Sequence, residues 1–328
     1  MKKIALWTAS VALGLAMVGC GQKSMLVVTS YSDASPRATE TVKAIKKEMK
    51  SENVPFYLNV FNMDLESRAS DTWREQRGHM AVVRADDFKA NVVLVAGDDA
   101  AKYFAERVVG KHIHVVYFDL AGAPAAYKLD NVEAATGVIQ DIPVAESFAA
   151  MKQLAPKAER VAVLSDASLE GNALVARIKT AKDLPLRVTE VRIASTRDEW
   201  AAALRDLQTK ADVLCIGGYS QVLAAKGNSA TVPPADILAL TSETSRMPDF
   251  AFRKEAVGAK GVMLSVFVPL EAQARTATRM ATDLLYYNVE PAKVPVRVVS
   301  ERGMVVNSDR AAQVGVSVPA DLKIPGQP

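Results

Sequence analysis

The chain has 328 residues, a length that suits about two domains, with 49% hydrophobic and 23% charged residues. This composition is typical of a globular protein and excludes a largely disordered chain or a polytopic membrane protein. The 40 Lys and Arg residues nearly balance the 37 Asp and Glu residues, whereas a nucleic-acid-binding surface needs a surplus of positive charge, so we expect no nucleic-acid partner.

The first twenty residues have the pattern of a bacterial export signal. Two lysines precede a mostly apolar run over residues 4–18, which matches the core of a signal peptide and is shorter than the roughly 20 residues of a membrane-spanning helix. Met17-Val18-Gly19-Cys20 is similar to the lipobox, in which the cysteine is lipidated, although Met17 stands where leucine is usual. We predict a lipoprotein signal peptide over 1–19, lipidation at Cys20 and a tether over 20–24. The alternative is a plain secretory signal with an incidental cysteine.

This signal predicts a mature chain in the cell envelope, anchored to a membrane by lipid and facing the periplasm or the outside. Cys215 is the only other cysteine, so no disulfide can form within a mature chain whose Cys20 carries lipid. Because Cys215 lies within the apolar run 213–216, we interpret it as a small core residue and not as a nucleophile.

From residue 25 onward the chain alternates short apolar runs with amphipathic stretches. In chain order, the first half is predicted to contain a strand over 25–29, a helix over 36–49, a strand over 56–61, a helix over 66–89, a strand over 92–96, a helix over 100–108 and a strand over 113–118. The strands are rich in Val, Ile and Leu, which is typical of a parallel sheet covered by helices on both faces.

The same alternation restarts near residue 140. It predicts a helix that starts at 143, strands over 161–164, 186–193, 213–216 and 237–240, and helices over 169–181 and 197–207. A strand over 262–268, a helix over 271–287, strands over 296–299 and 304–306 and a helix over 308–314 then follow. Because the preceding elements already complete two lobes, we expect these last elements to pack back on one or both of them.

We therefore predict an α/β fold of two doubly wound parallel-sheet lobes joined by a hinge. The N-terminal lobe is predicted to contain 25–141 and about 266–289, and the C-terminal lobe 142–265 and about 290–328. Chain crossings between the lobes are predicted near 140–142, 265–267 and 288–292. Several crossings of this kind allow two rigid lobes to close on each other by rotation.

The common enzyme motifs are absent from this sequence. It has neither a phosphate-binding G-x-x-x-x-G-K-[ST] loop nor a G-x-G-x-x-G after the first strand, so no nucleotide cofactor is expected. Gly218-Tyr219-Ser220 resembles part of a hydrolase nucleophile elbow, but Val222 replaces the final glycine and every histidine precedes Ser220. His112 and His114 are too few for a closed zinc site. We expect no enzymatic activity, no cofactor and no metal.

Polar and aromatic residues follow many of the predicted strands. In α/β sheets the carboxyl ends of the strands form the ligand-binding edge, so two facing lobes bring these residues to one cleft. The candidate ligand-binding residues are Ser30, Tyr31, Asp64, Asp98, Asp99, Phe118 and Asp119 in the first lobe and Ser165, Asp166, Gly218, Tyr219, Thr241 and Glu243 in the second. Each of them could instead cap a helix or stabilise a loop. The carboxylates favour a solute with amine or hydroxyl groups, and the rings favour one with a flat face.

Several motifs resemble one group of bacterial transport proteins. They are Leu26-Val-Val-Thr-Ser-Tyr31, the Gly-Asp-Asp-Ala-Ala of 97–101, Gly137-Val-Ile-Gln-Asp141, the Ser-Asp of 165–166 with a following glycine, and Val305-Val-Asn-Ser-Asp-Arg-Ala-Ala. This group is the substrate-binding lipoproteins of ABC transporters with the type I periplasmic-binding fold, in the branch that includes tryptophan- and tyrosine-binding members. The resemblance implies two α/β lobes, three hinge strands, a small molecule closed between the lobes and an ABC permease as partner. The first loop, 32–35, lacks the histidine, proline and aromatic residues that are usual in the family.

We interpret the chain as a lipid-anchored solute-binding protein of an ABC importer. It would capture a small polar or aromatic molecule between two lobes by hinge closure, and act as a monomer. The alternative is an envelope lipoprotein of the same fold that senses a ligand or scaffolds an assembly, and acts with a sensor kinase or an envelope complex rather than a permease.

Overall fold

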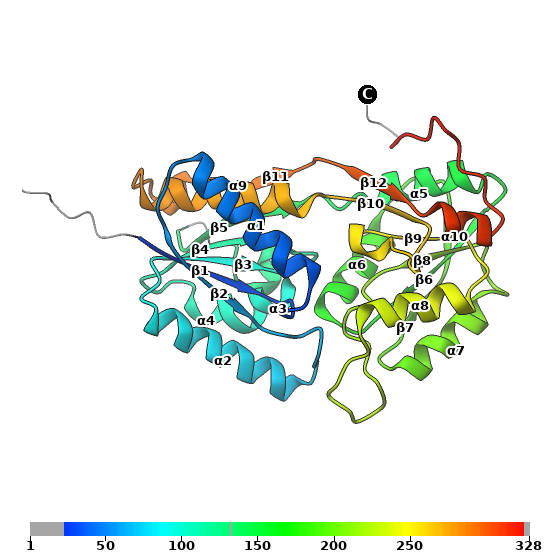
Figure 1. Ribbon diagram of the computed structural model, residues 1–328, viewed down its shortest axis with the longest axis horizontal. Coiled ribbons are helices and arrows are strands. Elements are labelled where there is room, and N and C mark those ends of the chain that lie inside the picture. The colour runs from blue at the N-terminus through cyan, green and yellow to red at the C-terminus, as the bar shows by residue number, and fades with distance from the viewer. Residues whose placement is uncertain (1–22, 132, 325–328) are drawn as a thin grey trace, which may run out of the picture.

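The computed structural model describes residues 23–131 and 133–324. The predicted signal peptide, Cys20 and most of the predicted tether lie outside these residues. Among the described residues, the strands form two six-stranded sheets, one in each of two lobes that lie side by side along the long axis of the molecule (Figure 1). The predicted fold class, with two doubly wound α/β lobes, is confirmed.

The first lobe is built on a sheet of parallel strands in the order β11-β5-β4-β3-β1-β2. Its strands are β1 (Ser24–Thr29), β2 (Tyr57–Asn62), β3 (Val92–Ala96), β4 (His114–Phe118), β5 (Ala135–Gln140) and β11 (Arg297–Val299). Its helices are α1 (Pro36–Ser51), α2 (Asp71–Asp87), α3 (Asp98–Ala100), a π-helical turn (Ala101–Ala105), α4 (Glu106–Val108) and α9 (Leu270–Leu285), with 3-10 turns at Pro124–Tyr127 and Pro291–Lys293.

The second lobe has the strand order β12-β10-β9-β8-β6-β7, in which only β12 is antiparallel to its neighbour. Its strands are β6 (Arg160–Ser165), β7 (Arg187–Ile193), β8 (Val213–Ile216), β9 (Asp249–Ala251), β10 (Leu264–Phe267) and β12 (Gly303–Val306). Its helices are α5 (Val144–Leu154), α6 (Leu169–Thr180), α7 (Arg197–Leu207), α8 (Pro234–Thr244) and α10 (Ser308–Gln313), with a 3-10 turn at Lys254–Ala256. No helix in the described part of the chain is long and apolar enough to cross a membrane.

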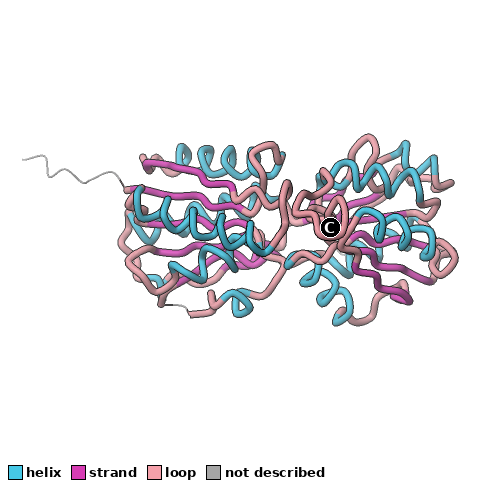
Figure 2. Tube along the Cα trace, turned by 90° about the horizontal axis from the view of Figure 1, so that it is seen from below, coloured by secondary structure: helices cyan, strands magenta, loops and turns pink. Residues whose placement is uncertain are grey.

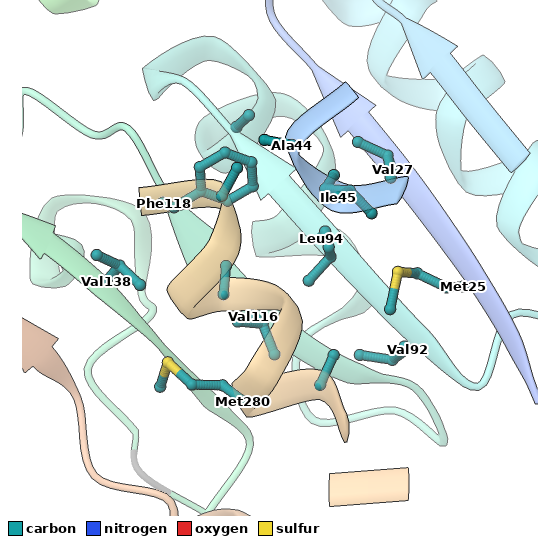
Figure 3. Packing of buried hydrophobic residues seen from close by; sticks show 14 of the residues in the cluster. Met25, Val27, Ala44, Ile45, Val92, Leu94, Val116, Phe118, Val138 and Met280 are labelled. Carbon is teal, nitrogen blue, oxygen red and sulfur yellow. The ribbon is translucent and has the colours of Figure 1, made fainter. Parts of the chain in front are cut away.

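Each sheet is covered on both faces by apolar side chains. In the first lobe, α1 and α9 pack together on one face, where Leu94 and Val116 of the sheet meet Ile45 of α1 and Met280 of α9 (Figure 3). The opposite face is covered by α2 and the short helices that follow β3. Because the strand interiors are buried in this way, the polar groups that can meet a ligand are confined to the loops at the strand ends.

Within the described residues, the chain passes between the two sheets three times. It crosses between β5 and α5, between β10 and α9, and between β11 and β12. The third crossing lies at 300–302 and not at the predicted 288–292, because β11 pairs with β5 in the first lobe. The prediction that all residues from about 290 onward belong to the second lobe is therefore wrong for β11. Arg302 of the third crossing donates to Asp141 of the first at 2.6 Å, which ties these two connections together.

Two local predictions are corrected by the structure, and two strands were not predicted. The predicted strand over 237–240 lies in α8, which begins at Pro234; proline favours the first turn of a helix, and a short apolar run alone does not separate a helix from a strand. The strands β5 and β9 were not predicted from the sequence. Helix α2 begins at Asp71 and not at residue 66, because the Ser70 hydroxyl caps it by accepting the Trp73 N–H.

A buried arginine holds the C-terminal helix against the second lobe. Arg310 of α10 is 3% exposed and Asp249 of β9 is fully buried. The guanidinium donates to Asp249 Oδ2 at 2.6 Å and to the backbone carbonyls of Ser242 and Ser245 at 2.9 and 3.1 Å. Because a buried charge without its partner is costly, this pair is a point on which the second lobe depends.

We expect Arg310→Met to lower the free energy of unfolding by about 3–5 kcal/mol, because it leaves Asp249 buried and unpaired. Chemical denaturation measures this change. The matched control is Arg275→Met, which removes a partly exposed ion pair with Glu301 and should cost less than about 1 kcal/mol. Equal losses in the two variants would contradict the prediction.

Candidate functional site

A cavity of about 810 Å³ lies between the two lobes, within the usual size range of small-molecule sites. Its walls include Ser30 after β1, Asp99 after β3, Tyr219 after β8 and Arg253 after β9. All of these residues follow the carboxyl ends of parallel strands, which is where α/β sheets bind ligands. Figure 2 shows the loops of the two lobes turned toward each other across the middle of the molecule.

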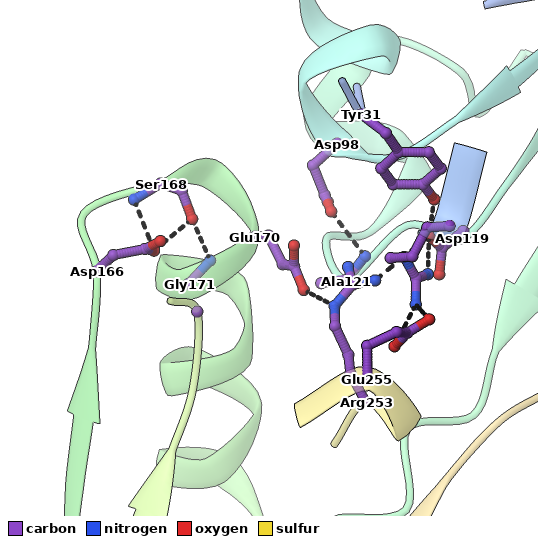
Figure 4. A network of polar contacts seen from close by, with 12 residues as sticks. Tyr31, Asp98, Asp119, Ala121, Asp166, Ser168, Glu170, Gly171, Arg253 and Glu255 are labelled. Carbon is purple, nitrogen blue, oxygen red and sulfur yellow. Dashed lines mark hydrogen bonds and ion pairs between the residues drawn. The ribbon is translucent and has the colours of Figure 1, made fainter. Parts of the chain in front are cut away.

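A network of buried charges lies beside the hinge, next to Gln140 and Phe267. On the first lobe its centre is Asp119, which follows β4 in a left-handed backbone conformation (φ 56°) and is 2% exposed. The carboxylate accepts hydrogen bonds from the Tyr31 hydroxyl and the Arg37 guanidinium (Figure 4). The same guanidinium lies over the Tyr31 ring, 5.2 Å from its centre. These contacts fix the first turn of α1 against the end of β4.

The second lobe adds three charges to this network. Glu255 Oε1 lies 3.2 Å from Arg37 Nη1, and Arg253 pairs with Glu170 while its Nη1 lies 3.7 Å from Asp119 Oδ2. Burial alone would raise the pKa of Asp119, but Arg37 and Arg253 hold it below its ordinary value. The pKa of Glu255 is lowered in the same way, since the two arginines outweigh its burial. The network is therefore ionised, and it joins the two lobes.

Two neighbouring aspartates after β3 have different surroundings. Asp98 accepts hydrogen bonds from the Tyr127 hydroxyl and from the backbone N–H groups of 121–122, so it ties two loops of the first lobe together. Asp99 faces the other lobe, and its Oδ2 accepts a hydrogen bond from Gln221 Nε2 at 2.7 Å. Burial raises the pKa of each carboxyl to about 6. Asp99 is thus a contact between the lobes as well as a residue of the cavity wall.

Another part of the cavity wall is apolar. Tyr219 lines the cavity and also belongs to the buried hydrophobic cluster of the second lobe. Pro233 and Pro234 at the start of α8, followed by Leu238 and Ala239, continue this wall. A solute in the cavity therefore meets charged groups at the hinge side and carbon-rich surface along α8.

The structure brings some of the predicted site residues together and places the others elsewhere. Ser30, Tyr31, Asp98, Asp99 and Tyr219 line the large cavity. Asp119 lines a smaller cavity beside it, near the hinge. Among the described residues, the candidates that line neither cavity are Asp64, Phe118, Ser165, Asp166, Gly218, Thr241 and Glu243.

Three of these candidates join the loops that follow β6 and β8. Ser165 Oγ accepts a hydrogen bond from the Gly218 N–H at 2.9 Å. Asp166 accepts hydrogen bonds from Ser168, the N-cap of α6, and from the backbone N–H of Gln221 at 2.8 Å. Figure 4 shows Asp166 turned toward the start of α6. In this structure they act as loop supports, the alternative that the sequence left open.

The other four have packing or surface roles. Phe118 is fully buried in the core of the first lobe, and the Asp64 carbonyl accepts the Trp73 indole N–H at 3.1 Å. The Thr241 hydroxyl of α8 accepts the indole N–H of Trp200 in α7. The Glu243 side chain is exposed beside Lys260. The last two follow the predicted strand over 237–240, which is a helix, so they do not lie at a strand end.

Arg37 and the partly buried charges of the second lobe, Glu170, Arg253 and Glu255, were not predicted from the sequence. Arg37 stands in the first turn of a helix, where a positive charge is unfavourable because that end of the helix dipole is itself positive. This position is a signal that the charge has a partner elsewhere, which the structure identifies as Asp119. Arg253 and Glu255 follow β9, a strand that the sequence analysis did not predict.

We expect Asp99 to make folding stability depend on pH. In the folded chain its pKa is about 6, against about 3.9 in an unfolded chain, so the folded form binds more protons between these values. Stability from this group is therefore lost as the pH rises from about 4 to about 7, by up to about 3 kcal/mol. Urea denaturation of the parent and of Asp99→Asn should show the difference between their unfolding free energies change by this amount. A difference that stays constant with pH would contradict the expectation.

Comparison with known proteins gives a family match that spans most of the chain. The model of a family described as ABC transporter substrate binding protein matches residues 89–326. No curated protein sequence matches the chain.

Solved structures share the architecture over nearly the whole chain. A domain from Streptococcus pneumonia in complex with L-Trp has a TM-score of 0.71 at 17% identity, and the match covers 91% of this chain and 97% of that one. A conserved domain protein from Vibrio cholerae has a TM-score of 0.72 at 14% identity, with 92% and 97% covered. A ligand-free, open substrate-binding protein with adhesive properties from Clostridium difficile has a TM-score of 0.63 at 16% identity, with 91% and 97% covered. At these identities the likeness establishes the fold alone.

Proposed function

Since the chain belongs to the ABC transporter substrate binding protein family, we propose that it captures a small solute between its two lobes and delivers it to an ABC permease. The observation that carries this proposal is the cavity of about 810 Å³, whose walls come from both lobes. The three crossings beside it give the chain a hinge about which the lobes can rotate. No bond in the solute needs to be made or broken.

In this proposal, binding acts on an equilibrium between an open and a closed arrangement of the lobes. Arg37 meets Glu255, and Asp99 meets Gln221, only when the lobes are together. A solute that touches both lobes adds contacts to the closed arrangement alone, so it shifts the population toward that form. The permease then recognises the closed form.

The polar atoms of the cavity favour a solute that carries both acceptor and donor groups. Arg37 and Arg253 bring guanidinium donors to the cavity wall, and Asp99 brings a carboxylate acceptor. A hydrogen bond to a charged group contributes about 1.5–3 kcal/mol, so a solute gains affinity by supplying an acceptor to the arginines and a donor to Asp99. The apolar wall along α8 favours a carbon-rich body. L-Trp, which is present in the Streptococcus structure, has all of these groups.

We expect a matching solute to stabilise the chain by about 2.7 kcal/mol at one hundred times its Kd. Thermal shift with L-tryptophan, other amino acids, purines and sugars measures this effect.

Arg253→Gln should weaken binding of the stabilising solute at least tenfold, as expected for loss of about 1.4 kcal/mol or more of hydrogen bonding. The matched control is Lys254→Gln, at an exposed neighbouring position. A panel without any stabilising solute, or equal affinity in the two variants, would count against the proposal.

We propose further that Cys20 anchors the chain to a membrane through lipid. The support is the signal-like run that ends at Met17-Val18-Gly19-Cys20. In addition, the first strand starts at Ser24, on the side of the first lobe away from the second (Figure 1). An anchor there leaves the cleft accessible to solute and permease.

Replacement of the anchor residue tests this proposal. We expect Cys20→Ala to release the chain from the membrane fraction or to stop its processing, because the variant has no thiol to carry lipid. Cell fractionation and the mass of the mature chain give the result. A correctly cut variant that remains in the membrane fraction would refute lipid anchoring at this residue.

A further inference from the structure

Two segments from opposite lobes pair at the edge of the cavity. One is the loop over 66–69, which precedes α2, and the other is the segment over 222–231 between β8 and α8, called the strap from here on. Figure 1 shows the strap as the long loop below α8. Glu66, Ser67 and Thr231 line the cavity, so the place where the two segments meet is part of the cavity wall.

The pairing is made by the backbone. The two hydrogen bonds run from Ala69 N–H to Ser229 O at 3.0 Å and from Thr231 N–H to Ser67 O at 3.1 Å. Between them, Arg68 and Ala230 face each other as an antiparallel bridge. The Thr231 hydroxyl adds a third bond, to the Glu66 carbonyl. Backbone pairing of this kind joins the lobes as neighbouring strands are joined in a sheet.

The strap is held to its own lobe independently of this pairing. Val232 N–H donates to Val222 O at 2.8 Å, and Leu223 N–H donates to Ser195 O at 2.9 Å. The exposed tip turns at Gly227, whose φ of 78° lies in the left-handed region that favours glycine. The strap can therefore leave the first lobe without losing its attachment to the second.

Gln221, directly before the strap, reinforces the contact. Its Oε1 accepts a hydrogen bond from Arg74 Nη2 at 2.6 Å, and its Nε2 donates to Asp99 Oδ2 at 2.7 Å. Both partners belong to the first lobe. One amide thus links the strap to two charged side chains that are largely buried there.

We propose that the strap is a latch: its pairing with residues 66–69 holds the two lobes together, so that its detachment sets the rate at which the cleft opens for solute exchange. The proposal rests on the proposed function for its solute, but the latch itself can be tested without one.

The first experiment tests the pairing in solution by a disulfide. Arg68 and Ala230 form the pair that lies between two backbone hydrogen bonds, where opposing Cα atoms are about 4.5 Å apart, a separation that a disulfide spans. We expect the Arg68→Cys/Ala230→Cys variant of the full chain to cross-link on mild oxidation at least tenfold faster than Arg68→Cys/Lys226→Cys, whose second cysteine is at the tip. The single variants control for pairing with Cys20 or Cys215. Equal rates in the two pairs would overturn the proposal.

The second experiment tests whether the latch controls access. Leu238→Cys places a reporter thiol on the cavity wall at a position that is 5% exposed. Its rate of labelling by a charged methanethiosulfonate therefore measures how often the cavity opens. Thr231→Pro removes one backbone donor and the hydroxyl bond of the latch, and should speed labelling about tenfold. Ser229→Ala leaves the backbone pairing intact and should label like the parent. Unchanged labelling in Thr231→Pro would overturn the proposal.

Exchange of L-tryptophan tests the latch independently of the proposed function. If L-tryptophan binds, the oxidised Arg68→Cys/Ala230→Cys variant should bind and release it at least tenfold more slowly than the reduced variant, and equal rates would overturn the latch alone. If no solute of the thermal-shift panel binds while labelling still depends on Thr231, the proposed function fails and the latch stands.

Discussion

The buried charges beside the hinge constrain the rest of the structure, because each of them needs a partner to be buried at all. Moving an ionised side chain out of water costs several kcal/mol unless an opposite charge and hydrogen bonds replace the water. Arg37 has Asp119 in its own lobe, and Arg253 has Glu170 in its own lobe. The contacts across the cleft, such as Arg37 with Glu255, are added to these. When the cleft opens, Arg37 and Arg253 each keep an opposite charge in their own lobe. Glu255, whose side chain is 20% exposed, exchanges Arg37 for water.

Hydrogen bonds between the loops that follow the strands hold these charged groups in fixed positions. In the first lobe Ser30 Oγ accepts the Ala100 N–H at 2.9 Å, and in the second lobe Ser165 accepts a loop N–H in the same way. Gly97 has a φ of 92°, and a side chain there would meet Ser30 Oγ at 2.6 Å. Most polar groups at the strand ends are thus engaged in hydrogen bonds that join one loop to the next. The groups left for a solute are the few that face the space between the lobes.

This division of roles explains what could be predicted from the sequence. The fold class follows from apolar runs such as 92–96, because a continuous run of Val, Leu and Ala predicts a strand that is buried on both faces of a parallel sheet. The polar residues at strand ends were also found, but local pattern does not say which of them support a loop and which face the cavity. Arg37 and Glu255 are 218 positions apart, so their contact has no local signature. The membership of β11 in the first lobe also depends on a pairing partner, β5, which lies far away in the sequence.

The contacts between the lobes must stabilise the closed cleft when a solute is bound, but must not keep the empty cleft closed. Each net hydrogen bond across it contributes about 1 kcal/mol to the closed form, and a solute can shift the equilibrium only by the affinity that it has for the closed form over the open one. If these contacts closed the empty cleft too firmly, the solute would find few open molecules to enter, and its apparent affinity would fall with the fraction that can bind it. Backbone bonds at the strap suit this balance, because they are modest in energy and water can replace them when the strap detaches. The ionic network beside the hinge suits it too, because its strongest pairs stay within single lobes. A cleft built in this way can open while empty and still gain enough from a solute that touches both lobes to remain closed around it.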